Sequence, residues 1–106
     1  MFESLSPALS DALTQRGFTA LTAVQEAVLD PALADRDLRI ASQTGSGKTL
    51  AIGFVLSPAL EALDPTQRGG PFALLIAPTR ELAAQLAKEL TWLFESQPIG
   101  VAVVAG

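Results

Sequence analysis

Apolar residues recur at helical spacing in several parts of the chain, between residues that start and stop helices. Ser6 and Pro7 are a capping residue and a proline at the first helical position, and Gly17 ends the amphipathic pattern that follows them. Thr22 and Gln25 have the spacing of a capping box, in which each side chain accepts a hydrogen bond from the other residue's backbone N–H. These signals predict helices over residues 7–16, from residue 22 to about residue 30, over residues 47–63, and between Thr79 and Pro98.

Three segments of strand length lie between and after these helices, over residues 38–41, 72–77 and 99–105. The run over 72–77 is continuously apolar, which is typical of a parallel strand that is buried on both faces. The elements follow one another as helix, helix, strand, helix, strand, helix, strand, an order that implies parallel strands joined by right-handed crossovers. The sequence therefore predicts an α/β fold with a parallel sheet flanked by helices.

The composition suits a covered sheet, because 49% of the 106 residues are hydrophobic, and the length allows one small domain at most. The longest apolar stretch is interrupted by Ser57, Pro58 and Glu61, so it does not reach the length of a membrane span. The N-terminus lacks the basic and then apolar order of a signal peptide. We therefore expect a cytoplasmic protein that does not contact a membrane.

The net charge of −4 and the scattered positions of the seven basic residues provide no basic stripe of the kind that indicates nucleic acid. Any nucleic-acid strand is therefore expected to be held by a few local contacts. The chain has no cysteine and no histidine. Disulfides, structural zinc sites and catalysis by a thiol or an imidazole are excluded for these residues.

The glycine-rich segment over residues 42–49 has the character of a phosphate-binding loop, because it lies between a predicted strand and a predicted helix. Its glycines allow successive backbone N–H groups to point at phosphate oxygens, near the positive end of the helix that follows. Lys48 would then reach the β- and γ-phosphates, and the hydroxyl of Thr49 would complete a Mg²⁺ shell. We interpret the segment as a nucleoside-triphosphate site formed by Ser42, Gln43, Thr44, Gly45, Ser46, Gly47, Lys48 and Thr49.

One observation keeps another interpretation of this segment open. The strict pattern G-x-x-x-x-G-K-[ST] has a glycine where this chain has Ser42, so the match is to the second half of the pattern. A flexible surface loop that ends in a lysine is the alternative.

Three segments, taken together, resemble motifs of one family, the DEAD-box ATP-dependent RNA helicases. The phosphate loop is similar to their first motif, A-x-T-G-S-G-K-T, with Ser42 in place of the usual alanine. Residues 78–85 resemble their P-T-R-E-L-A-x-Q motif without departure. Residues 17–25 resemble the adenine-recognising Q motif, G-F-x-x-P-T-x-I-Q, with Leu21 replacing the proline and Val24 the isoleucine. The resemblance covers essentially the whole chain.

The resemblance implies a RecA-like P-loop domain that binds ATP with Mg²⁺ and contacts RNA. It implies catalytic roles in ATP hydrolysis for Lys48 and Thr49, with Thr49 as the residue that binds the metal. It implies adenine binding by Phe18 and Gln25, with Phe2 as the aromatic residue that stacks on the base. It also implies an RNA contact at the start of a helix, by Pro78, Thr79 and Arg80.

Several of these residues also have a purely structural interpretation. Gln25 completes the capping box, which its spacing from Thr22 explains fully. Thr79 and Arg80 are suited to the start of a helix, although a helix N-terminus with an adjacent hydroxyl and guanidinium also binds a backbone phosphate. Phe2 would be a loose terminal residue when no nucleotide is present.

The family's Asp-Glu-Ala-Asp box, its Ser-Ala-Thr motif and its second RecA-like domain with arginine fingers are not in this sequence. We therefore interpret residues 1–106 as the N-terminal part of a helicase's first RecA-like domain, truncated before the DEAD motif. The expected function of the full-length parent is RNA-stimulated ATP hydrolysis that drives local unwinding of RNA duplexes. The isolated chain is expected to be inactive and to self-associate through an unpaired strand edge.

Two functions from other classes remain as alternatives. The chain would be a non-catalytic module that binds a nucleotide or phosphate, or part of an unrelated P-loop enzyme such as a kinase. Residues 78–85 argue against the kinase.

Overall fold

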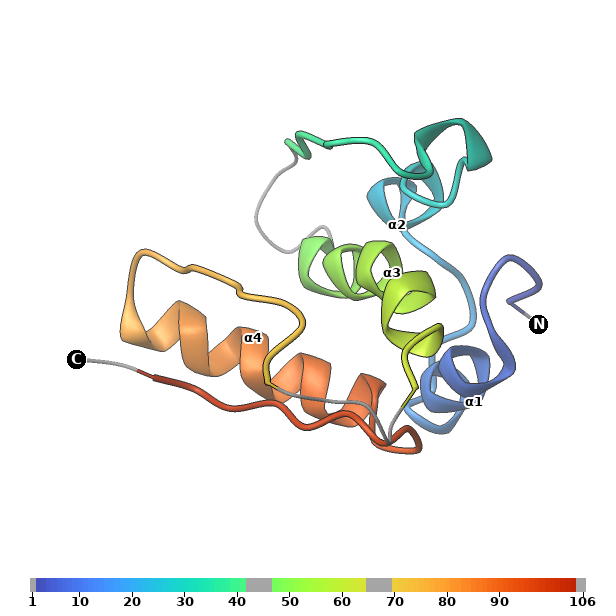
Figure 1. Cartoon of the computed structure of the whole chain (residues 1–106). Coiled ribbons are helices and arrows are strands. Elements are labelled where there is room, and N and C mark those ends of the chain that lie inside the picture. Colours follow the sequence, from blue (N-terminus) through green and yellow to red (C-terminus); the bar gives the residue numbers. More distant parts are fainter. Residues whose placement is uncertain (1, 42–46, 65–69, 105–106) are drawn as a thin grey trace.

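The computed structural model describes residues 2–41, 47–64 and 70–104. Within these ranges the chain forms helices joined by extended segments and turns (Figure 1). The elements are α1 (Pro7–Gln15), α2 (Ala23–Ala27), a short 3₁₀ helix (Pro31–Leu33), α3 (Lys48–Glu61) and α4 (Arg80–Leu93). Each helix that the sequence predicts is present, and none in the described ranges has both the length and the apolar character to cross a bilayer.

The helices begin at the capping residues that the sequence indicates. The Ser6 hydroxyl accepts a hydrogen bond from the N–H of Leu9 at 3.5 Å, and the Thr79 hydroxyl accepts one from the N–H of Leu82 at 3.1 Å. Such caps satisfy backbone donors of the first turn, which have no partner within the helix. The starts of α1 and α4 are therefore determined locally by the sequence.

The core forms where α1, α3 and α4 meet, and the first residues of the chain close it. The apolar faces of the three helices turn toward one another, because each helix carries leucine or phenylalanine at helical spacing. The buried cluster consists of Phe2, Leu9, Leu13, Leu50, Phe54, Leu90, Leu93 and Phe94.

Helices α3 and α4 approach closely at Gly53, which is buried in the middle of α3. A Cβ atom at this position would lie 2.5 Å from Cδ2 of Leu93 and 3.1 Å from Cδ2 of Leu90. Both leucines are themselves buried, so neither can move out into solvent to make room. The contact between the two helices therefore requires glycine at position 53.

We expect Gly53→Val to destabilise the protein, because the new side chain would overpack this contact at a cost of about 1–3 kcal/mol. Valine has a slightly better helix propensity than glycine, which offsets only a few tenths of a kcal/mol. Thermal unfolding of the full-length protein should show a lower Tm. Ala59→Val is the control, because it places the same valine side chain at an exposed position of the same helix. Equal Tm values for the two variants would contradict the tight contact.

The predicted parallel sheet is not confirmed. Residues 38–41, 72–77 and 99–104 are extended, but no part of the described chain is assigned as a strand. The apolar side chains of residues 72–76, which were expected to be buried, are instead exposed, with Leu74 at 85% and Ile76 at 87%. Val104, in the last of these segments, is 97% exposed. A helix satisfies its backbone within itself, whereas a strand needs a neighbouring strand for its hydrogen bonds. These segments have the composition of buried strands without that neighbour.

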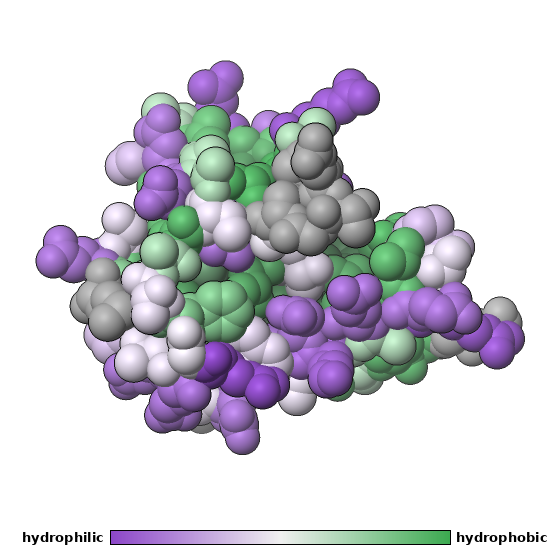
Figure 2. Space-filling view, turned by 180° about the vertical axis from the view of Figure 1, so that it is seen from behind, coloured by the Kyte–Doolittle hydropathy of each residue, from purple (hydrophilic) through white to green (hydrophobic). Residues whose placement is uncertain are grey.

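Two of these extended segments border an apolar hollow beside the helix pair. The hollow measures about 450 Å³, and residues 70–75 and 99–104 line it together with the apolar faces of α3 and α4. Figure 2 shows hydrophobic residues reaching the surface of one face of the molecule, among polar ones. Exposed apolar surface of this extent typically marks a face that another structural element covers.

Candidate functional site

The predicted phosphate loop is described only in its second half. Ser42, Gln43, Thr44, Gly45 and Ser46 lie outside the described residues, so their predicted contacts are untested. Gly47 is the N-cap of α3, and Lys48 and Thr49 are its first two residues. Gly47 has φ 92° and ψ 21°, in the left-handed region that favours glycine. The loop therefore enters the helix through the glycine that the motif provides.

The N-terminus of α3 gives this part of the site a positive potential. The first backbone N–H groups of a helix have no partner within it, and their dipoles favour an anion in front of them. Lys48 and Thr49 are both partly exposed in this first turn. The arrangement suits a phosphate group.

Gln25 connects the second helix to this loop. Its side-chain Oε1 accepts a hydrogen bond from the backbone N–H of Thr22 at 2.9 Å. Its backbone N–H donates to the Thr22 hydroxyl at 3.4 Å. The predicted capping box is thus confirmed. Its Nε2 also donates to the backbone carbonyl of Gly47 at 3.3 Å. Only 2% of Gln25 is exposed, whereas Thr22 is exposed and Gly47 is partly exposed, so these hydrogen bonds lie at the edge of the buried interior.

The same contact leaves no room for a side chain at position 47. A Cβ atom there would collide with Nε2 of Gln25 and would lie 3.0 Å from the hydroxyl oxygen of Thr22. Gly47 is therefore required both by its backbone conformation and by the close approach of Gln25. The sequence motifs identify both residues, but no local spacing predicts that they touch.

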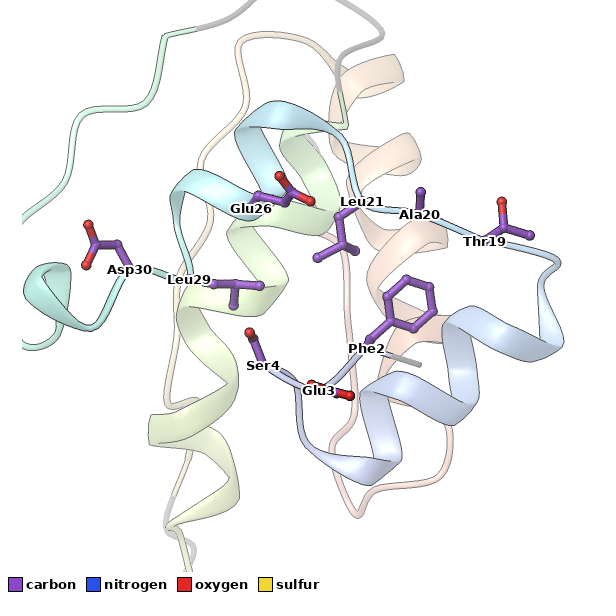
Figure 3. A pocket seen from close by; sticks show the side chains of 9 residues that line it. All are labelled: Phe2, Glu3, Ser4, Thr19, Ala20, Leu21, Glu26, Leu29 and Asp30. Atoms are coloured by element: carbon purple, nitrogen blue, oxygen red, sulfur yellow. The ribbon is translucent and has the colours of Figure 1, made fainter.

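A second feature is a hollow of about 520 Å³ between the N-terminal segment, the residues after α1, and α2 (Figure 3). The ring of Phe2 points from below toward the segment that carries Ala20 and Leu21. Phe2 is only 6% exposed and belongs to the core, so the expected loose terminal residue is not observed. Apolar side chains and three carboxylates surround the hollow, which is lined by Phe2, Glu3, Ser4, Thr19, Ala20, Leu21, Glu26, Leu29 and Asp30.

The chemistry of this hollow differs from that of the phosphate loop. Its apolar wall suits a flat ring, and the carboxylates of Glu3, Glu26 and Asp30 suit a group that donates hydrogen bonds. Phosphate would be repelled there by the negative charges. Gln25 does not line the hollow, because its side chain is directed to Gly47, whereas the next residue, Glu26, does. The structure therefore places Phe2 and Gln25 in adjoining parts of one region rather than in one cavity.

Phe18 lies outside this hollow and packs on Trp92, a residue to which the sequence assigns no functional role. The two rings are stacked with centroids 5.9 Å apart and an interplanar angle of 20°. The guanidinium carbon of Arg16 is 4.8 Å from the centroid of the Trp92 ring. Helical spacing predicts only that Trp92 helps to close the core, so the stack was missed.

The predicted RNA-binding residues gather at the start of α4. Thr79 is the N-cap of this helix and Arg80 is its first residue, so the structural interpretation of Thr79 as a cap is confirmed. Pro78, Thr79 and Arg80 are all exposed. A second helix N-terminus thus presents a hydroxyl and a guanidinium to solvent, which suits an anionic ligand.

A metal site of protein ligands alone is not found in the described part of the chain. There, no group of at least three aspartate or glutamate residues lies close enough together to hold an ion. Thr49 is therefore the one predicted metal ligand that the structure describes, and it lies in the first turn of α3.

Comparison with known proteins identifies the relatives of this chain. Residues 22–106 match the family model described as DEAD/DEAH box helicase. The chain is 39% identical over 104 residues to DEAD-box ATP-dependent RNA helicase 53 of Oryza sativa subsp. japonica, covering 96% of this chain and 17% of the relative. It is 43% identical over 105 residues to the ATP-dependent RNA helicase HAS1 of Saccharomyces cerevisiae, covering 93% of this chain and 20% of that protein.

A solved structure shares the arrangement of the backbone. The crystal structure of the RNA helicase Prp28 from Chaetomium thermophilum bound to ADP superposes with a TM-score of 0.88 and 34% sequence identity. The match covers 100% of this chain and 26% of that one. The chain thus spans about a fifth or less of the length of the helicases from Oryza sativa and Saccharomyces cerevisiae named above.

Proposed function

The chain belongs to the DEAD/DEAH box helicase family, and from this premise we propose that it forms the nucleotide-binding part of an ATP-dependent RNA helicase. The observation that carries the proposal is the hydrogen bond between Gln25 and Gly47. It joins the predicted adenine-reading motif to the predicted phosphate loop across 22 positions of the sequence. One nucleotide could therefore contact both motifs at once.

In this proposal the triphosphate lies in front of the N-terminus of α3. The backbone N–H groups and the Lys48 ammonium neutralise its negative charge. The Thr49 hydroxyl would contribute one ligand to a bound Mg²⁺ ion, which usually takes most of its ligands from phosphate oxygens and water. A Mg²⁺ ion bound there would supply Lewis-acid polarisation of the γ-phosphate, and Lys48 and Thr49 would hold that group in place.

The adenine would lie near the hollow beside Phe2. The apolar wall can accept a planar base, and the carboxylates at its border favour an exocyclic amine. Gln25 uses its acceptor oxygen and one N–H within the protein, so its second Nε2 hydrogen is the group that we assign to the base.

RNA would bind at the start of α4. Thr79 and Arg80 form an exposed helix N-terminus, and Pro78 precedes them. Contacts of this kind recognise the phosphate backbone and carry no sequence information. We therefore propose that the site holds one strand without reading its bases.

We further propose that residues 1–106 are the first part of a RecA-like domain, whose remaining strands cover the 450 Å³ hollow. The exposure of Leu74, Ile76 and Val104 supports this proposal, because paired strands would bury them. Without such cover, the isolated chain would associate with itself and would lack the groups that complete ATP hydrolysis.

The full-length protein tests this function directly. We expect its ATP hydrolysis to accelerate when single-stranded RNA is added, and we expect it to separate a short RNA duplex only when ATP is present. Phosphate release and strand displacement are the measurements. A protein that binds ATP without hydrolysing it under either condition would instead be the non-catalytic nucleotide-binding module.

A further inference from the structure

We propose that Trp92 is a positioning residue for nucleotide recognition. Its ring holds Phe18 in place, and through Phe18 it sets the position of residues 19–21, which line the 520 Å³ hollow. The proposal rests on the proposed function, because it assigns this hollow to the base of the nucleotide.

The first step is the way in which α1 ends. Gly17 has φ 87°, its N–H donates to the carbonyl of Thr14, and the N–H of Phe18 donates to the carbonyl of Leu13 at 3.0 Å. This pair of hydrogen bonds is a Schellman motif, in which the left-handed glycine turns the chain sharply at the end of the helix. Phe18 therefore leaves α1 in a defined direction.

The second step is the contact that receives Phe18. Its ring stacks on Trp92 in the last turn of α4, and the guanidinium of Arg16 lies over the same indole ring. Offset aromatic stacking and cation–π contacts are both attractive and both depend on geometry. The Trp92 side chain thus fixes both Arg16 and Phe18, the residues on either side of Gly17, to α4.

The third step leads from Phe18 to the hollow. Thr19, Ala20 and Leu21 directly follow Phe18 and form one side of the hollow, opposite Phe2 (Figure 3). Hydrogen bonds anchor the two ends of this segment, from the N–H of Phe18 to Leu13 and from the N–H of Thr22 to Gln25. Between those anchors the segment depends on side-chain packing, to which the stack on Trp92 contributes directly.

Substitution of Trp92 should therefore affect the binding of some ligands and not of others. Loss of the Trp92 ring should disturb the wall that faces the base. Gly47, at the start of α3, lies further along this chain of contacts, beyond the hydrogen bonds of Thr22 and Gln25, which the substitution leaves in place. A ligand with a base should therefore lose affinity, and a ligand made only of phosphates should not.

The test compares ADP with inorganic tripolyphosphate as ligands of the full-length protein, measured by calorimetry. For Trp92→Ala we expect ADP affinity to fall roughly three- to tenfold, the range that the loss of one aromatic pair produces, with tripolyphosphate affinity unchanged. Trp92→Phe, which keeps a ring for stacking, should restore most of the ADP affinity. Phe18→Leu serves as a second variant if Trp92→Ala does not fold, and it should show the same selective loss.

Two results would overturn the inference. One is unchanged ADP affinity in Trp92→Ala, and the other is an equal loss for both ligands, which would indicate a general structural role. If the unmodified protein bound tripolyphosphate but bound ADP no more tightly than pyrophosphate, the proposed function itself would fail, and the inference with it.

Discussion

Lys48→Ala should abolish ATP turnover in the full-length protein while leaving its fold intact. The Lys48 ammonium lies at the first residue of α3, where it would neutralise charge on the transferred phosphate. Removing one group that stabilises developing charge typically lowers kcat by about a hundredfold or more. Alanine is a good helix former, and Lys48 is not part of the buried core, so the helix should persist.

The measurement is the steady-state rate of ATP hydrolysis with and without RNA, together with the Tm of each protein. Lys88→Ala is the matched control, because it removes the same charge from an exposed position in α4. Near-normal hydrolysis by Lys48→Ala would remove the phosphate loop from the proposed mechanism.

Gln25→Ala should remove the preference of the protein for ATP over GTP. The variant loses the amide that we assign to the base, and it also leaves the Thr22 N–H and the Gly47 carbonyl without their partner. Thr22 is exposed and Gly47 is partly exposed, so water can replace part of these hydrogen bonds and the cost should be close to the roughly 1 kcal/mol of a lost cap. We therefore expect a lower Tm as well as a loss of roughly tenfold in base preference.

Gln25→Glu separates these two effects. A glutamate at this position can still complete a capping box, because its carboxylate accepts from the Thr22 N–H. It cannot donate to the Gly47 carbonyl or to a base when it is ionised. The affinities for ATP and GTP should therefore converge in both variants. If both retained the preference of the unmodified protein, the role of Gln25 would be limited to the helix start.

The sequence predicts the parts of this fold that local interactions determine. Ser6, Thr22 and Thr79 each start a helix because a side-chain oxygen accepts a hydrogen bond from the N–H three positions further along, so spacing alone identifies them. The strands are different, since a strand forms only when a distant segment supplies its hydrogen bonds. The runs over 72–77 and 99–104 have a strand composition, but their partners are not specified by their own residues.

The same distinction between local and distant interactions applies to the candidate site. The motifs identify Gly47, Lys48 and Gln25 as residues of interest, and the structure adds that Gln25 touches Gly47. The stack of Phe18 on Trp92 joins residues that are 74 positions apart in number, from 18 to 92, and no periodicity connects them. Only the folded arrangement of α1 against α4 brings the two rings together.

The contact at Gly53 also determines how α3 and α4 respond to force. Leu90 and Leu93 press against the bare backbone of α3 there, and backbone cannot yield by changing rotamer as a side chain can. The two helices should therefore move together as one rigid body. Lys48 is the first residue of α3 and Arg80 is the first residue of α4. A displacement of the first turn of α3 should therefore move the start of α4 by a similar amount.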